Sequence, residues 1–446
     1  MASKLWDKGF SLDDKIERFT VGQDRVLDLA LAPYDILGTL AHIRMLAMQD
    51  LLPAEELPVL LVVLKELYAS AAAGSFVIEE GVEDVHSQVE LMLTQRLGDR
   101  GKKVHSGRSR NDQVLVDIKL FLRAEIEEMV HLTEALFGRF RDASEQYKAV
   151  LMPGYTHLQV AMPSSFGLWF GAYAESLTDD MHLLQAAWRV TNQNPLGSAA
   201  GYGSSFPLDR TMTTRLLGFD DLNYNVVYAQ MGRGKTEKIV AFAMASLAAT
   251  LSKFAMDACL YMSQNFGFIV LPENLTTGSS IMPHKKNPDV FELIRGKCNR
   301  IQTIVSDITL MLTNLPSGYF RDLQLLKEIL FPAFGDLKSC LNILISTVPE
   351  IKINTHILDD ARYDCMFSVE AVNRLVLEGV PFRDAYRQVA QDIREGRFVP
   401  DKHLSHTHEG SIGRLCNEEI ARKMEAAVRA FGFDKVHQAV AALVGA

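Results

Sequence analysis

The sequence lacks the features that mark secreted and membrane-spanning proteins. Its five cysteines occur singly and without CxxC spacing, at positions 259, 298, 340, 365 and 416, which predicts free thiols in a reducing compartment. The N-terminal segment has no apolar signal core. The most apolar stretch, residues 239–252, lies between Lys238 and Lys253 and is too short to span a bilayer. These absences predict a soluble, cytoplasmic protein.

An excess of positive charge is also missing. The 446 residues carry a formal net charge of −9, which argues against binding to nucleic acid. Hydrophobic residues (48%) and charged residues (23%) occur in the proportions of a globular chain. The length is enough for two or three domains, and the sequence contains no internal repeat or low-complexity segment.

Sustained alternation of polar and apolar residues, which would indicate strands, is absent, and helical patterns take its place. Apolar residues from Ile36 to Leu46 recur at helical spacing, and Pro53 ends the run. Further helices are predicted over residues 55–73, 83–97, 112–137, 164–193, 236–264, 288–315, 321–346, 368–379, 382–395 and 417–431. We therefore expect an all-α fold.

The segment 236–264 indicates how these helices assemble. Its 29 residues contain neither Gly nor Pro, and it would form a helix about 43 Å long. The segment is apolar nearly all round, so we expect it to be buried on every side. One chain rarely covers so long a helix, so we infer that helices from several subunits pack together. The expected domains are an N-terminal helical domain, a central long-helix bundle and a small C-terminal helical domain, over residues 1–105, 106–353 and 354–446, with Trp6 and Phe10 as candidate packing anchors.

Three stretches resemble known motifs without meeting their requirements. Residues 232–236 (GRGKT) end like a phosphate-binding loop, but Ala229 stands where the first glycine would fall and no strand precedes it. Residues 197–203 (GSAAGYG) lack the βαβ context of a dinucleotide site. A metal site is a weaker interpretation than a surface or capping loop for the cluster His403, His406 and His408, because no Cys or helical carboxylate partner accompanies it.

Two polar stretches are better candidates for a binding site. Residues 98–111 (GDRGKKVHSGRSRN) combine basic side chains with glycines. The acidic total and the lack of interleaved aromatic residues disfavour a nucleic-acid patch. A carboxylate-binding loop fits better, because guanidinium groups pair bidentately with carboxylates.

The second stretch is residues 277–289 (TGSSIMPHKKNPD). Its glycine and two prolines predict a loop, and Asn287-Pro288-Asp289 is typical of a helix start. Lys285 and Lys286 beside a helix N-terminus would favour negative charge in a ligand. The alternative interpretation is a solvated basic loop.

Four polar segments together resemble a known family: EDVH (83–86), SGRSRNDQ (106–113), MPGYTHLQ (152–159) and GSSIMPHKKNPD (278–289). The last resembles the signature loop of the fumarase/aspartase superfamily. HSGRSRNDQ and MPGYTHLQ narrow the resemblance to the argininosuccinate lyases, and NPLGSAAG and DVFELIRGK are also similar. The resemblance extends from about residue 5 to residue 415.

The resemblance implies reversible cleavage of argininosuccinate to arginine and fumarate, without a metal or an organic cofactor. It also implies a homotetramer with a twenty-helix core, in which each active site is assembled from three subunits. A proton must leave a carbon next to a carboxylate while a C–N bond to a guanidinium opens. Such a site needs a base, fixed positive charge for the carbanion and a proton for the leaving nitrogen.

The resemblance also assigns roles to single residues. Ser279 is implied as the base, and Lys285 and the following helix N-terminus would favour its anionic oxygen. His157 is implied as the proton donor or relay, oriented by Glu292; from the residue alone, a buried core histidine is the alternative. The implied substrate-binding residues are His86, Arg110, Asn111, Thr156, Arg233, Asn287, Tyr319, Gln324 and Lys327. Without the resemblance, the last three would be interpreted as solvent-facing helix residues.

The sequence departs from the family pattern mainly at the arginine end of the substrate. Asp24 stands where a serine is usual, Gly232 and Gly234 replace acids, His284 replaces Gln, and Leu326 replaces an acid. A modified arginine, such as an N-acylated one, is therefore an open alternative. Two others are a sister lyase such as adenylosuccinate lyase, disfavoured by GRSRNDQ, and a non-catalytic structural homologue like those of eye lenses, disfavoured by the intact catalytic set.

Overall fold

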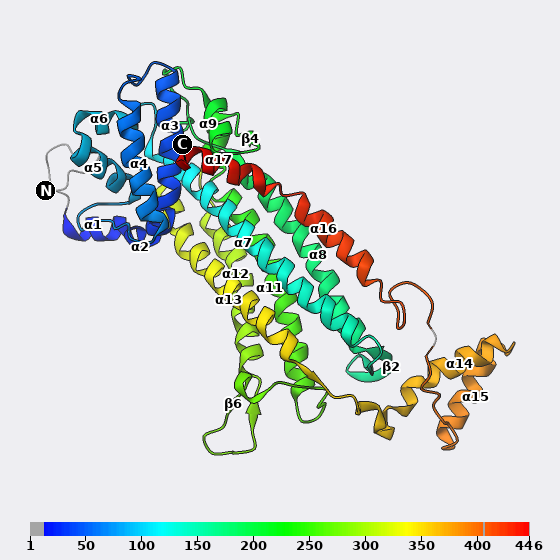
Figure 1. Cartoon of the computed structure of the whole chain (residues 1–446). Helices are drawn as coiled ribbons and strands as arrows, with labels where there is room; N and C mark the ends of the chain where they lie inside the picture. The colour runs from blue at the N-terminus through cyan, green and yellow to red at the C-terminus, as the bar shows by residue number, and fades with distance from the viewer. Residues whose placement is uncertain (1–12, 405, 446) are drawn as a thin grey trace.

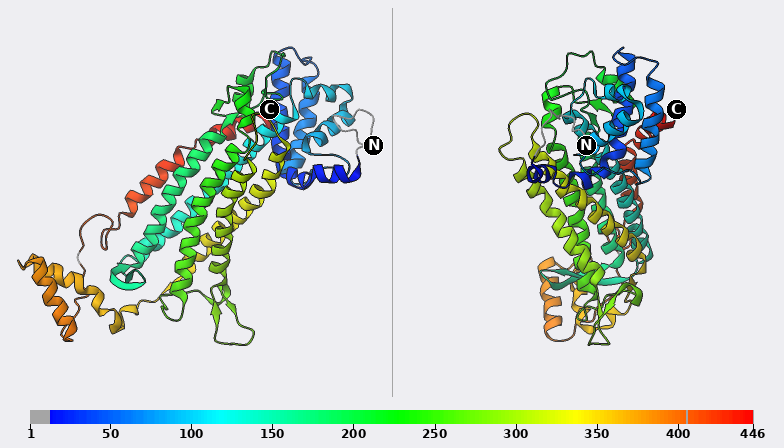
Figure 2. Two further views of the ribbon diagram at one scale, coloured as in Figure 1. Left: turned by 180° about the vertical axis from the view of Figure 1, so that it is seen from behind. Right: turned by 90° about the vertical axis from the view of Figure 1, so that its left-hand side faces the viewer.

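The computed structural model describes residues 13–404 and 406–445. The molecule is elongated: short N-terminal helices gather at one end, long helices run along the middle, and a small helical pair lies at the far end (Figure 1). The two further views show the same arrangement (Figure 2). The candidate anchors Trp6 and Phe10 lie outside the described residues.

The N-terminal end is built from short helices around a buried one. The central helix is α3 (Ala32–Met48), whose apolar residues from Ile36 to Leu46 are almost all inaccessible. The neighbouring helices are α1 (Asp14–Val21), α2 (Asp24–Leu27), α4 (Leu57–Ala72), α5 (Val85–Leu97) and α6 (Asp99–Lys102). Asp84 begins α5 by accepting a hydrogen bond from the Ser87 amide, as an N-cap residue does. The helices expected over 55–73 and 83–97 are confirmed.

Five long helices form the middle of the molecule: α7 (Arg110–Gln146), α8 (Phe166–Thr191), α11 (Lys235–Met262), α12 (Asp289–Met311) and α13 (Leu326–Thr347). Ser109 caps α7 in a capping box with Asp112, and the helix continues through Gly138 to Gln146, beyond the predicted end at Phe137. Phe254 of α11 packs against Trp169 and Phe140, with ring centroids 5.4 and 4.7 Å apart. The prediction of a long-helix bundle and an all-α fold is confirmed.

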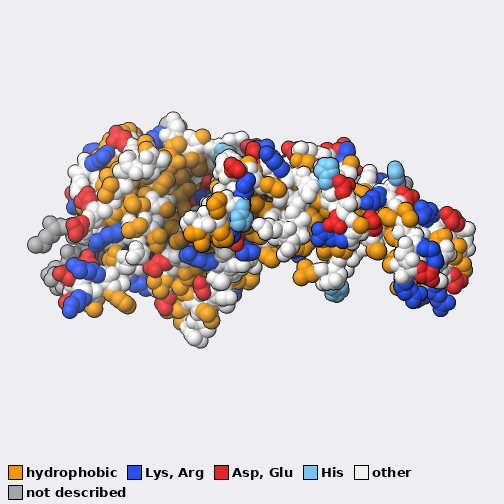
Figure 3. Space-filling model, turned by 90° about the horizontal axis from the view of Figure 1, so that it is seen from below, with side chains coloured by type: hydrophobic (Ala, Val, Ile, Leu, Met, Phe, Trp, Pro, Cys, Tyr) orange, Lys and Arg blue, Asp and Glu red, His pale blue; other side chains and the backbone are white. Residues whose placement is uncertain are grey.

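The central helix α11 is covered mostly, but not completely, by its own chain. Val240, Leu247 and Phe254 are inaccessible, whereas Phe242 and Met256 remain 51% and 47% exposed. Hydrophobic side chains also gather around a hollow on the face seen from below (Figure 3). One chain therefore does not bury this helix on every side, and the expectation that helices of several subunits bury it together stays a prediction.

The structure corrects the prediction that the most apolar segment is too short to span a bilayer. Residues 24–48, 235–262 and 321–350 form stretches long and apolar enough to cross a membrane, by length and composition alone. The estimate from residues 239–252 was too short because α11 continues past both Lys238 and Lys253. In this fold, apolar residues of all three stretches pack in the core: Ile36, Leu247 and Leu330 are buried there.

Short strands, which the sequence analysis did not predict, connect the long helices. They pair as β1 (Leu151–Thr156) with β2 (Gln159–Ser165), β3 (Gln193–Asn194) with β4 (Asp221–Leu222), β5 (Ile269–Val270) with β8 (Lys352–Ile353), and β6 (Thr277–Gly278) with β7 (Lys286–Asn287). The β1–β2 hairpin was missed because Pro153, Gly154 and Pro163 interrupt any alternating pattern. The four sheets within the described residues have two strands each, so they position loops and do not form a core layer.

The C-terminal segment divides into two parts. The pair α14 (Ser368–Leu377) and α15 (Phe382–Arg394) has its own small core of Val372, Ala385 and Val389. The chain then returns along the bundle through α16 (Asn417–Arg429) and α17 (Phe433–Gly445) (Figure 1). Two short helices, α9 (Arg210–Leu216) and α10 (Val226–Met231), precede α11. The division into domains at 105 and 353 stays a prediction.

Candidate active site

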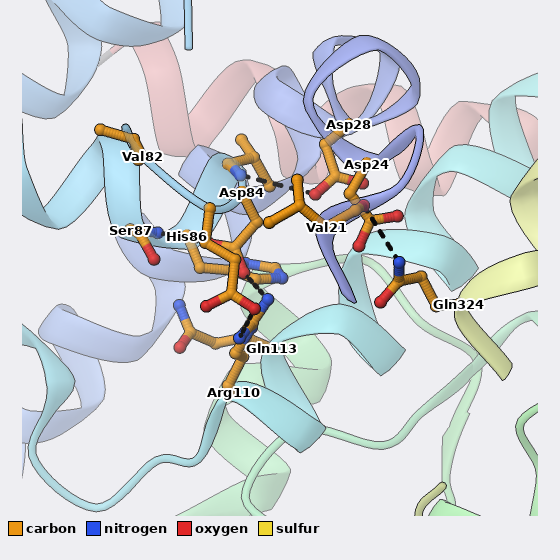
Figure 4. Close-up of polar contacts among 12 residues, drawn as sticks. Val21, Asp24, Asp28, Val82, Asp84, His86, Ser87, Arg110, Gln113 and Gln324 are labelled. Atoms are coloured by element: carbon orange, nitrogen blue, oxygen red, sulfur yellow. Dashed lines mark hydrogen bonds and ion pairs between the residues drawn. The ribbon is translucent and has the colours of Figure 1, made fainter. Parts of the chain in front are cut away.

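A polar cavity of about 220 Å³ lies where the N-terminal helices meet the beginnings of α7 and α13. Most of the expected substrate-binding residues line it: His86, Arg110, Asn111, Arg233, Tyr319, Gln324 and Lys327. Figure 4 shows His86, Arg110 and Gln324 among these polar contacts. Residues separated by more than two hundred positions in the sequence therefore form one binding site.

Arg110 is held in the cavity by two acids. It lies in the first turn of α7, 3.1 Å from Glu83 and in a closer ion pair with Asp84. Although burial opposes its charge, Asp84 and Glu83 raise the pKa of Arg110. Glu83 also pairs with Arg321 at 2.6 Å. The guanidinium groups are thus fixed before any substrate arrives, as bidentate recognition of a carboxylate requires.

Lys327 is buried between two acids on the opposite wall. Its ammonium group is 2.7 Å from Asp24 and also contacts Asp28. Burial opposes its charge, but Asp28 and Asp24 raise the pKa of Lys327. Burial in turn raises the pKa of Asp24 to about 6. Gln324 donates to the carbonyl groups of Thr20 and Val21. Neither Lys327 nor Gln324 is therefore a simple solvent-facing helix residue.

Two departures from the family pattern follow from local packing. Gly234 has a φ of 78°, and a Cβ there would lie 2.2 Å from Leu312 Cδ2, so an acid at this position would strain the backbone and displace the Leu312 side chain. The acid that Arg233 uses is instead Glu237, one helical turn later, with 2.6 Å between Arg233 Nε and Glu237 Oε1. Leu326 is 1% exposed, where an unpaired acid would be costly.

His157 lies far from this cavity, at the tip of the β1–β2 hairpin. His157 and Leu158 form a two-residue turn with φ values of 54° and 57°, the conformation that such tight hairpins require. Leucine rarely adopts it, so the hairpin imposes local strain. Thr156 and His157 are both exposed. The interpretation of His157 as a buried core histidine is therefore excluded.

The segment 277–289 forms a loop closed by the β6–β7 pair. The Ser279 hydroxyl oxygen accepts hydrogen bonds from the backbone amides of Met282, at 3.1 Å, and Ile281, at 3.4 Å. Two donors on this oxygen favour its anionic form. Asn287 does not cap α12: it lies in β7, its side chain donates to the Gly278 carbonyl at 3.4 Å, and Pro288 is the N-cap. The predicted helix start was thus one residue too early.

The remaining predicted catalytic groups are exposed near this loop. Lys285 is exposed, and within the described chain its ammonium group forms no ion pair. Glu292 lies in the first turn of α12 and is also exposed. No hydrogen bond or ion pair among the described residues joins Glu292 to His157. The expected orientation of His157 by Glu292 therefore does not occur within one chain and stays a prediction.

One long helix separates the two groups of site residues. Before α11 begins, Arg233 lines the cavity, and just after α11 ends, Phe266 packs 5.5 Å from Tyr155, next to Thr156. The 28 residues of α11 correspond to about 42 Å. The hairpin and the β6–β7 loop both lie at that far end of the molecule (Figures 1 and 2). Ser279 and His157 therefore do not reach Arg110 of the same chain.

Only part of the basic stretch 98–111 serves the cavity. Arg110 and Asn111 line it, whereas Lys103 pairs with Glu56 on the surface and Arg108 donates to Thr39 beneath it. The prediction that the whole stretch binds carboxylates is therefore too broad. Four cavity residues were not predicted: Asp28, Asp84, Val114 and Arg321. Asp84 lies within the EDVH motif, which was the available sign for it.

The histidine-rich stretch near residue 405 does not form a metal site in the described chain. His403 is fully exposed, and His406 bonds to Ser411 and Glu370. The described residues contain one group with metal-ligand composition: Asp35, His86 and Asp117. Asp35 Oδ1 and His86 Nδ1 are 2.7 Å apart, a hydrogen-bond distance, whereas two tetrahedral ligands of an ion would lie about 3.3 Å apart. The geometry therefore fits a shared proton better than a cation.

Comparison with known proteins identifies the family. The full chain is 64% identical over 444 residues to the argininosuccinate lyase of Parabacteroides distasonis, with 100% of each chain covered. It is 37% identical over 391 residues to that of Thermotoga neapolitana, covering 88% of this chain and 98% of the relative. Residues 13–303 match the family described as Lyase.

Solved structures share the fold at low sequence identity. An EDDS lyase in complex with formate has a TM-score of 0.76 at 21% identity, covering 98% of this chain and 95% of the other. The class II fumarase of Schistosoma mansoni has a TM-score of 0.70 at 15% identity, covering 95% and 94%. The fold is thus that of the fumarase/aspartase lyases. Within that class, the chain belongs to the argininosuccinate lyase family.

Proposed function

We propose that the protein catalyses the reversible β-elimination of argininosuccinate to L-arginine and fumarate, a step of arginine biosynthesis. The observation that carries this proposal is the cavity that gathers Arg110, Arg233 and Lys327 with several acids, in a chain 64% identical to argininosuccinate lyases over its full length. A substrate with carboxylates at both ends and cationic nitrogen groups matches this mixture of charges.

The chemistry is proposed to occur where the loop of one subunit closes over the cavity of another. Ser279 removes the proton next to the carboxylate, and the two backbone amides on its oxygen stabilise the required anion. Lys285 and Asn287 balance the negative charge that develops on the substrate carboxylate. His157 supplies the proton to the leaving nitrogen, with Glu292 of a neighbouring subunit as its partner.

A homotetramer with shared active sites is part of the proposal. Support comes from the exposed apolar side chains of α11 and from the separation of Ser279 from Arg110 within one chain. We also propose that the enzyme is soluble and cytoplasmic, and that it requires neither a metal nor an organic cofactor. We also propose that Thr156 binds substrate in a site shared between subunits, because it lies beside His157 on the hairpin.

A direct assay tests the function. Purified protein mixed with argininosuccinate is expected to produce fumarate, detected by its ultraviolet absorbance, and adenylosuccinate is expected to produce none. Absorbance that rises only with adenylosuccinate would instead establish the sister lyase. Absence of turnover with both, from a folded tetramer, would support a non-catalytic homologue.

Asp24 provides a test of the arginine end. The carboxylates of Asp24 and Asp28 carry one more negative charge than the Lys327 ammonium group neutralises. This remaining negative charge favours a substrate with a free, positively charged α-ammonium group over one whose α-nitrogen is acylated and neutral. We expect Asp24→Ser to raise KM for argininosuccinate about tenfold, the loss of one charged hydrogen bond, with little change in kcat. Steady-state kinetics on argininosuccinate and an N-acetylated analogue would show this. A lower KM for the acetylated substrate with the native enzyme would favour a modified arginine.

A further inference from the structure

A buried trio of titratable side chains lies beneath the cavity. His86 Nδ1 is 2.7 Å from Asp35 Oδ1 and 3.3 Å from Asp117 Oδ2, and all three side chains are at most 3% exposed. His86 comes from α5, Asp35 from α3 and Asp117 from α7. Three helices that are distant in sequence therefore converge on one imidazole, which also lines the cavity.

The two carboxyl groups share one proton. Neither oxygen of Asp117 accepts a hydrogen bond from a donor among the described residues, yet its carboxyl group lies close to that of Asp35. Burial and the Asp35 charge raise the pKa of Asp117 well above its usual value. Burial opposes the charge of Asp35, but the hydrogen bond from His86 lowers the pKa of Asp35. Asp117 is therefore the protonated acid and Asp35 the anion.

The anion in turn fixes the state of the ring. Burial disfavours an imidazolium, but the hydrogen bond and charge of Asp35 raise the pKa of His86 above its usual value. With Nδ1–H directed at Asp35, the other ring nitrogen, Nε2, is the one available to the cavity. A protonated His86 presents a charged donor there.

Other charged groups surround the trio. Asp84, at the start of α5, and Asp28, before α3, add negative charge near the ring. Arg108 and His105, which precede α7, add positive charge, but burial lowers the pKa of His105 to about 4. Arg108 is close enough to Asp35 to stabilise its negative charge. The acids around His86 therefore favour its charged form despite the nearby guanidinium.

We propose that Asp35 is a positioning residue that orients His86 as a charged hydrogen-bond donor to a carboxylate of the fumarate part of the substrate, with Asp117 completing the network as a neutral acid. The proposal rests on the function proposed above and adds two residues, Asp35 and Asp117, that do not touch substrate. It explains why two acids are buried beneath a site that binds a dianion: through His86 they present a cation to it.

The test compares two isosteric substitutions in the full-length protein. Asp35→Asn removes the anion, so His86 loses its proton near neutral pH. Asp117→Asn replaces a neutral hydroxyl donor by a neutral amide donor to Asp35. We expect Asp35→Asn to weaken fumarate binding about tenfold or more at about pH 8, and less at about pH 6, because the ring recovers its proton at low pH. Asp117→Asn and the native protein should show little change across this range.

Isothermal titration calorimetry with fumarate gives this readout without turnover. Fumarate affinity in Asp35→Asn with the same pH dependence as the native protein, or equal damage from Asp117→Asn, would overturn the proposal. His86→Gln serves if Asp35→Asn does not fold: it should bind fumarate weakly at every pH, and native-like binding would refute the role. The native protein and Asp35→Asn could show the expected difference in fumarate binding while the native protein does not cleave argininosuccinate. That result would refute the proposed substrate and leave the role of Asp35 intact.

Discussion

Replacement of Ser279 by alanine is expected to lower kcat for argininosuccinate by about 10³-fold, the usual contribution of a positioned general base. The hydroxyl oxygen that accepts hydrogen bonds from the Met282 and Ile281 amides is then missing, and the proposed proton acceptor is lost with it. Binding of substrate should persist, because the cavity residues lie on another part of the fold.

Ser280→Ala is the matched control for this variant. Its hydroxyl group is exposed and makes no hydrogen bond within the described chain, so kcat should stay within about tenfold of the native value. Steady-state kinetics, calorimetry of substrate binding and the tetramer's mass are the measurements. A fully active Ser279→Ala protein would remove Ser279 from the role of base.

Two inactive variants should restore activity when they assemble together. Ser279→Ala damages the loop and Arg110→Ala damages the cavity, and α11 separates these groups within one chain. If each site takes its loop and cavity from different chains, random mixing in a closed tetramer leaves about a quarter of the sites intact. Coexpression of differently tagged chains, with purification of mixed tetramers, should therefore recover about that fraction of native kcat.

A second pair of variants controls for activity that comes from contaminating native enzyme. Ser279→Ala and Lys285→Ala lie in the same loop, so every loop in their mixed tetramers carries one defect and activity should remain absent. Activity in this pairing would indicate exchange with native enzyme. Verified Ser279→Ala and Arg110→Ala mixed tetramers without activity would contradict a site shared between subunits.

Most helices could be predicted because their causes are local. Between Lys235 and Met262 no Gly or Pro interrupts the chain, and the expected limits differ from those of α11 by a residue or two. The β1–β2 hairpin could not be predicted in this way. Its strands contain Pro153 and Gly154 and are specified by pairing with each other, and its turn uses positive φ at His157 and Leu158.

The site residues likewise divide into those that the local sequence predicts and those that it does not. Arg110 and Ser279 were recognised because they lie in dense polar motifs. Asp35 and Asp117 were missed because each is a single acid within an apolar helical stretch, where nothing in the neighbouring residues shows that it faces His86. Arg108 shows the converse: its motif suggested a substrate contact, but the structure turns it toward Thr39.

The helical class, the polar motifs and the family of this chain can be read from its sequence, because spacing and residue type are properties of short segments. Which charges meet depends on the folded chain: the fold places Lys327 between Asp24 and Asp28, buries the acids beneath His86 and separates Ser279 from the cavity. The physical reason is that electrostatic and hydrogen-bonding partners are set by distance in space, and long helices bring together, or hold apart, residues whose positions in the chain do not indicate it.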